Sequence, residues 1–274
     1  MPAETITFHK MLTGCIQQEP KYWEFFVSTY GRLSQGLVER HFMPLKNESL
    51  EIMREVFRAA GHNGGTFLKE FSGTSEREFL IHFERKVFDL ARKRSDGVKR
   101  QSDFEASFLA DLFDEVPLAY QEVALLAMKG IPPDESNQIL RVPLALVQTG
   151  SAAVLKKWSE MAGQGISSFP HLEDSVRQEI EKEQGPNCPP IKIFADVLDG
   201  RIVWRDKQHV ESHVADCLYC LDRETTLKEM LFFLRILSPL SPEAVHGVLI
   251  DLNIEAKPSL ARSSILRKFM RVFK

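Results

Sequence analysis

The chain has 274 residues, of which 43% are hydrophobic and 27% are charged, and its formal net charge is −3. This is the composition of a globular protein that is long enough for one large domain or several small ones. The small net charge excludes the strongly basic character of many nucleic-acid-binding proteins. No apolar run approaches the ~18 residues that a membrane span requires, and the N-terminus lacks the pattern of a signal peptide. We therefore expect a cytoplasmic protein without a membrane span.

Charged residues are unevenly distributed along the chain. Basic side chains predominate in residues 1–100 and 231–274, whereas acidic side chains predominate in residues 101–230. This alternation indicates separate modules, with basic surface at both ends and acidic surface between them.

Apolar residues recur with helical spacing along almost the whole chain. Helices are predicted over residues 76–94, where Thr74 or Ser75 is placed to cap the first turn, and over residues 50–60. Residues 21–42 are rich in aromatic side chains and predict one or two buried helices. The expected apolar stripes are Phe79, Phe83, Val87 and Leu90 in the first of these helices, and Leu50, Met53 and Phe57 in the second.

The predicted fold class is all-α and multi-domain. Only residues 191–194 and 200–204 have the composition of strands, and both segments are short. Breaks rich in Gly, Pro and polar residues separate the helical segments. The predicted divisions are a helical domain at 1–100, a second helical domain at 101–162, a linker at 163–187, a small metal-binding module at 188–222 and a helical extension with a basic tail at 223–274.

The second domain has the pattern of a helix-turn-helix. A helix is predicted over residues 113–129, a short helix over 135–140 with Asp134 as its cap, and a longer one over 144–158, with proline-containing turns between them. Two short helices before a third are typical of proteins that read the major groove of DNA. A plain helical bundle is the alternative, because this segment carries little positive charge.

Cysteine usage favours a metal site over a disulfide framework, because the chain has only four cysteines and three of them cluster. Cys188 is followed by His213, Cys217 and Cys220, the last three in His-x3-Cys-x2-Cys spacing. Three thiols and one imidazole complete a tetrahedral Zn²⁺ site with no open position, which indicates a structural or sensing role. His209 is a competing ligand.

Two further inferences concern the thiols. Metal-bound thiolates are the reactive form of cysteine, so redox sensing through Cys217 and Cys220 is an alternative to a purely structural site. The remaining cysteine, Cys15, is expected to be a small buried hydrophobic residue.

The region around the metal-binding pattern resembles a bacterial family. Cys188-Pro189, then ADVLDG at 195–200 and VESHVADCLYC at 210–220, is similar to the zinc-binding anti-sigma domain. The resemblance implies that the four residues named above bind Zn²⁺, and that the module contacts a protein regulator or another part of its own chain.

The preceding part of the chain resembles extracytoplasmic-function sigma factors. EIMREVFRAA at 51–60 and the segment 67–94 look like their region 2, and the helix-turn-helix looks like their region 4. The resemblance implies binding to the bacterial RNA polymerase core through Glu51, Arg54, Glu55 and Phe57. It also implies contact with promoter DNA through Arg85, Lys86, Arg92, Lys93 and Arg94 of region 2 and through Gln148, Thr149, Ser151, Lys156 and Lys157 of region 4.

These observations predict a sigma factor-like regulator of transcription initiation that carries an anti-sigma-like domain. The acidic character of residues 101–160 favours an alternative, in which a degenerate sigma-like module binds polymerase or a regulator without reading a promoter. We do not expect an enzyme, because the sequence contains no phosphate-binding glycine loop, no nucleophile elbow and no zinc-protease spacing.

Overall fold

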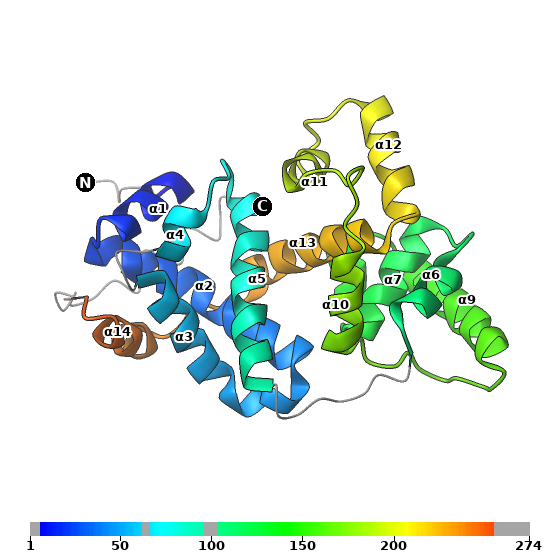
Figure 1. The fold of residues 1–274 in the computed structure, drawn as a ribbon, viewed down its shortest axis with the longest axis horizontal. Helices are drawn as coiled ribbons and strands as arrows, with labels where there is room; N and C mark the ends of the chain where they lie inside the picture. The colour runs from blue at the N-terminus through cyan, green and yellow to red at the C-terminus, as the bar shows by residue number, and fades with distance from the viewer. Residues whose placement is uncertain (1–5, 62–65, 96–103, 255–274) are drawn as a thin grey trace. The chain divides into compact units, whose positions relative to one another are not determined.

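The computed structural model describes residues 6–61, 66–95 and 104–254. Within these ranges it contains fourteen α-helices and one 3-10 helix and no strand, so the predicted all-α class is confirmed (Figure 1). The two strand candidates are instead part of helix α11 (Ile191–Leu198) and the turn that leads into helix α12 (Trp204–Ala215). The predicted polar break at 96–103 and the basic tail at 261–274 lie outside the described residues.

The chain forms two compact units, and boundaries between them fall near the ends of three long helices. Unit 1 comprises Met1–Glu39, Leu45–Arg94 and Phe233–Lys274, and unit 2 comprises Arg40–Pro44 and Ser95–Phe232. Unit 2 therefore holds the predicted helix-turn-helix, the predicted linker and the whole predicted metal-binding module in one body.

Unit 1 is built around aromatic side chains. Phe26 packs edge-on against Phe57, with ring centroids 5.1 Å apart, and Tyr30 packs edge-on against Phe79 at 5.5 Å. Such edge-to-face pairs contribute beyond the apolar area that they bury. The helices are α1 (Phe8–Ile16), α2 (Pro20–His41), α3 (Ser49–Gly61), α4 (Thr66–Glu70), α5 (Glu76–Ser95) and α14 (Pro242–Asp251), with the 3-10 helix η1 at Met43–Glu48 crossing the unit boundary.

Helix α5 begins at a reciprocal cap. The Ser75 hydroxyl accepts the backbone N–H of Glu78 at 3.3 Å, and the Glu78 carboxylate accepts the backbone N–H of Ser75 at 3.0 Å. This capping box satisfies two amides that have no partner within the helix, which confirms the predicted start of the helix.

Two sequence predictions about unit 1 have different outcomes. Cys15 is fully buried, and its burial raises the pKa of the thiol, so the predicted hydrophobic role is confirmed. Leu50, in contrast, belongs to the predicted buried stripe of α3 but is 43% exposed. The buried face is rotated toward Ile52, Met53, Val56, Phe57 and Ala60.

Unit 2 contains the helix-turn-helix arrangement. Helices α8 (Pro133–Leu140) and α9 (Leu144–Ala162) meet at 112° across a three-residue turn, and both pack on α7 (Leu118–Met128). This angle lies within the ~90–120° range of the motif. Arg141 ends α8 in the left-handed conformation, with φ of 57°.

Two boundaries in unit 2 differ from the prediction. The helix expected over 113–129 begins only at Leu118, as α7, because Glu115 has φ of 55° and Pro117 occupies the N-cap. Phe113 instead ends a separate helix, α6 (Ala106–Phe113). The segment predicted as a linker contains helix α10 (Asp174–Lys182), which buries Val176 and Ile180 against the unit.

Among the described residues, no single helix is long and apolar enough to cross a membrane. Helices α8 and α9 together have the length and apolar composition of a span, but the chain bends by 112° between them.

Candidate metal centre

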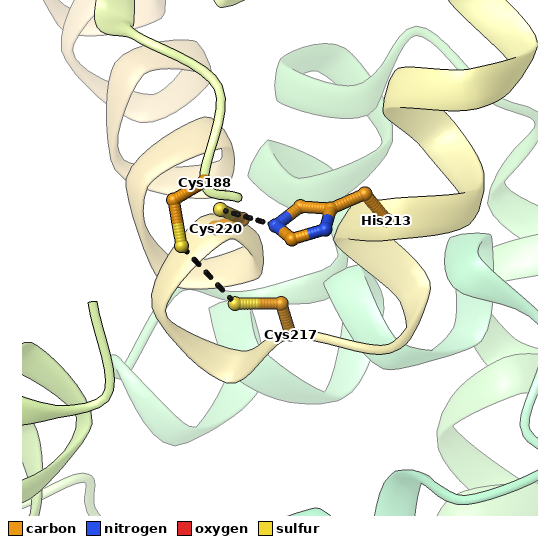
Figure 2. Close-up of side chains that lie close together, drawn as sticks. All are labelled: Cys188, His213, Cys217 and Cys220. Atoms are coloured by element: carbon orange, nitrogen blue, oxygen red, sulfur yellow. Dashed lines mark hydrogen bonds between the residues drawn. The ribbon is translucent and has the colours of Figure 1, made fainter. Parts of the chain in front are cut away.

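The four predicted ligands come from three segments of unit 2. Cys188 lies in the loop before α11, and His213 lies in the last turn of α12. Cys217 occupies the corner between α12 and α13 (Leu218–Ile236), and Cys220 lies in the first turn of α13. A new helix starts between the last two cysteines, and Cys220 points back toward His213 (Figure 2).

The ligand atoms converge as a bound metal ion would require. All four lie within 4.8 Å of one another, with Cys188 Sγ 3.8 Å from Cys217 Sγ and His213 Nε2 3.2 Å from Cys220 Sγ (Figure 2). Two sulfurs bound tetrahedrally at ~2.3 Å from one ion stand about 3.8 Å apart. The cluster can therefore hold a four-coordinate metal ion.

The local electrostatics favour a thiolate at the corner. A hydrogen bond between the Cys220 and Cys217 side chains lowers the pKa of Cys217 to about 5, and the same pairing raises the pKa of Cys220. Cys217 also immediately precedes α13, where the unpaired amides of a helix N-terminus stabilise a negative charge. The backbone N–H of Gly185 donates to Cys188 Sγ at 3.3 Å, which orients the distal ligand.

Gln121 supports the ligand-bearing corner from α7. Its side-chain amide lies within hydrogen-bond distance of the carbonyls of Ala215 (3.0 Å), Val116 (2.9 Å) and Phe113 (3.2 Å). Ala215 is the last residue of α12 and lies between two metal ligands. Sequence reasoning missed this residue, although a glutamine within the apolar run LAYQEVALLAM was the available signal.

His209 is not part of the cluster. It is exposed on α12, and the four ligand atoms that converge belong to other residues.

Unit 2 also contains a buried network of charged side chains. Lys129 Nζ lies 2.8 Å from Asp222 Oδ1 and also donates to Thr226 Oγ1 at 2.8 Å. His41 Nε2 lies 3.2 Å from Glu229 Oε1, and the network thus follows α13 away from the metal ligands. The charge pattern of the sequence did not reveal that these side chains are buried.

His41 is held neutral within this network. Burial, opposed in part by Glu229, lowers its pKa to about 4, and Arg177 and Lys129 add to the lowering. Arg177 Nη2 lies 3.2 Å from His41 Nδ1 and can only donate, so Nδ1 accepts and the imidazole proton resides on Nε2, facing Glu229.

The predicted DNA-contacting residues of α5 differ in their surroundings. Arg85 and Lys93 are exposed, and Lys86 and Arg92 are half-buried. Arg94 is held by two carboxylates of unit 1, with its guanidinium 2.6 Å from Glu55 and 2.8 Å from Glu48.

The predicted readers on α9 also fall into two groups. Gln148 and Thr149 are exposed, and Ser151 is half-buried. Lys156 pairs with Glu160 at 3.8 Å, and the Lys157 ammonium donates to a backbone carbonyl, that of Asp114.

The predicted polymerase-binding residues lie on α3. Glu51, Arg54 and Glu55 are half-buried at the surface of this helix. Phe57 is a core residue with no exposed surface, so its side chain contributes to the fold of unit 1.

Comparisons with known proteins find no match. No protein-family model matches the chain, and no similar protein is found among the curated proteins or the solved structures.

Proposed function

We propose that the chain is a sigma factor-like regulator of transcription initiation that binds the bacterial RNA polymerase core and promoter DNA. The observation that carries this proposal is the 112° helix-turn-helix, whose second helix exposes Gln148 and Thr149. Both side chains can hydrogen-bond with base edges in the major groove. The exposed basic residues of α5, Arg85 and Lys93, are suited to phosphate contacts.

We further propose that the metal centre binds Zn²⁺. Three thiols and one imidazole are the donor set of a closed structural zinc site, and softer donors disfavour Mg²⁺ or Ca²⁺. When bound, the ion would cross-link the loop before α11 to the corner between α12 and α13. Because these helices are short, the ion would supply much of the free energy that holds them in place.

A second candidate function is supported by the state of the lysines on α9. Lys156 and Lys157 are both engaged within unit 2, so the exposed face of α9 offers little positive charge to phosphates. This favours a module that binds polymerase, or a protein regulator of it, without reading a promoter.

Co-elution with the core RNA polymerase tests the part that both candidates share. The full chain is expected to elute with the core enzyme on size exclusion, and separate elution would contradict both. Gln148→Ala with Thr149→Ala then separates them, since only the first candidate predicts weaker binding of the holoenzyme to promoter DNA. Gln178→Ala, an exposed glutamine on α10, is the matched control.

A further inference from the structure

Helix α14 lies against α3 within unit 1, although 180 residues of sequence separate the two (Figure 1). At the C-terminal end of α14, Asp251 Oδ2 lies 3.3 Å from Arg58 Nη2 and 3.6 Å from Arg54 Nε. Gly247 lies beside the same arginine, since a Cβ built there would stand 4.0 Å from Arg54 Nη2. The acidic end of α14 thus sits on the two arginines of α3.

The remaining contact of α14 is apolar. Val245, Val248 and Leu249 are buried on one side of the helix. Leu252, just beyond its end, lies 3.1 Å from the point where a Cβ on Gly61 would stand. The side chains of Asp251, Arg54 and Arg58 remain about a third exposed, at 31%, 36% and 35%, and ion pairs this exposed contribute little stability. A ten-residue helix held in this way can be displaced by a competing partner.

The charged side chains predicted to bind polymerase are all engaged within unit 1. Glu51 pairs with Arg58 at 2.9 Å, Arg54 pairs with Asp251, and Glu55 pairs with Arg94 at 2.6 Å. A partner that uses this face of α3 must therefore replace contacts that the chain already makes with itself.

We propose that α14 is a built-in competitor for the docking face of α3, and that the ion pairs of Asp251 add to the apolar contact that keeps it there until a partner displaces it. The face that α14 occupies fits a short amphipathic helix with an acidic residue at its end. This inference rests on the proposed function, because it identifies the competing partner as the core RNA polymerase.

Charge reversal of Asp251 in the full chain tests the proposal. Asp251→Lys removes both ion pairs and places three positive charges together. It does not weaken α14 as a helix, because a basic residue near a helix C-terminus is favourable. Glu243→Lys is the matched control: it makes the same change of charge in the exposed first turn of α14, where a lysine is unfavourable for the helix itself.

Two readouts keep the outcomes distinct. Amide hydrogen exchange measures the release of residues 242–254 from α3. Titration with the core RNA polymerase measures binding affinity, and thus the competition. In Asp251→Lys we expect faster exchange in this segment and about fivefold tighter polymerase binding, whereas Glu243→Lys should show a smaller increase in exchange and an unchanged affinity. Unchanged exchange in Asp251→Lys would overturn the role of Asp251. Faster exchange with unchanged affinity would overturn the competition.

Failure of the proposed function gives a different result. If no form of the chain binds the core enzyme, the identification of polymerase as the competing partner is overturned. The role of Asp251 in holding α14 on α3 is then decided by the exchange data alone.

Discussion

The Gln121 side-chain amide donates to the backbone carbonyl of Ala215 at 3.0 Å, and this bond joins α7, the helix on which the helix-turn-helix packs, to the metal-binding corner. Ala215 lies two residues from both His213 and Cys217. The orientation of two ligands is therefore tied to α7, so that the metal centre and the helix-turn-helix are parts of one structural unit.

Substitution of Gln121 tests this link. Gln121→Ala would remove the amide that three partly or fully buried carbonyls share, and we expect a loss of about 1–3 kcal/mol in the free energy of unfolding together with faster metal loss to a chelator. Gln138→Ala, an exposed amide on α8, should change neither quantity. Equal rates of metal loss in the two variants, measured with a chromogenic chelator, would rule out a supporting role for Gln121.

The metal content of ligand variants tests the proposed zinc site. The purified chain is expected to contain one Zn²⁺ per molecule by elemental analysis, and Cys217→Ser should lose most of it. Cys15→Ala is the control, because Cys15 is a buried cysteine of unit 1 and is not a ligand. Full zinc content in Cys217→Ser would contradict the assignment of this ligand. Substitution with Co²⁺ should give the absorption bands of a tetrahedral thiolate complex.

The buried imidazole of His41 predicts a dependence of stability on pH. The ordinary pKa of histidine is about 6.5 and that of His41 is lowered to about 4, so between these values the unfolded chain binds a proton that the folded chain does not. Stability should therefore fall as the pH falls from about 6.5 to about 4, by at most about 3 kcal/mol from this group. Urea unfolding at pH 7 and pH 5 measures the change. His41→Gln should show a smaller difference between the two pH values, and an unchanged difference would contradict the assignment.

The pair formed by Lys129 and Asp222 predicts a large cost on truncation. Both side chains are buried, so Lys129→Ala leaves the Asp222 carboxylate without its main counter-charge, at a cost of about 3–5 kcal/mol. Lys207→Ala removes an exposed lysine that pairs with Glu211 on α12 and should cost less than about 1 kcal/mol. Similar unfolding midpoints for the two variants would show that the buried pair does not stabilise unit 2.

The sequence predicted the features that depend on local spacing. Short sequence patterns predicted the cap at Ser75, the turn of the helix-turn-helix and the four metal ligands. The structure contains each of these three features. Helical periodicity did not predict which residues are buried where tertiary packing determines the buried face. Leu50 has the spacing of a core residue but lies on the outer side of α3.

Long-range contacts were not accessible from the sequence. The pairing of Asp251 with Arg54 and that of His41 with Glu229 join segments nearly 200 residues apart, and no local pattern encodes such contacts. The segment 163–187 was interpreted as a linker because of its Gly and Pro content. Helix α10 within it is stabilised by burial of Val176 and Ile180, a property that composition does not report.

Run-off transcription with the core RNA polymerase is the most direct test of the proposed function. Genomic fragments serve as templates, and the core enzyme alone provides the background. We expect the full chain to direct initiation from discrete start sites, and the variant with Gln148→Ala and Thr149→Ala to reduce this signal while Gln178→Ala retains it. Binding to the core enzyme without initiation at any discrete site would contradict promoter recognition.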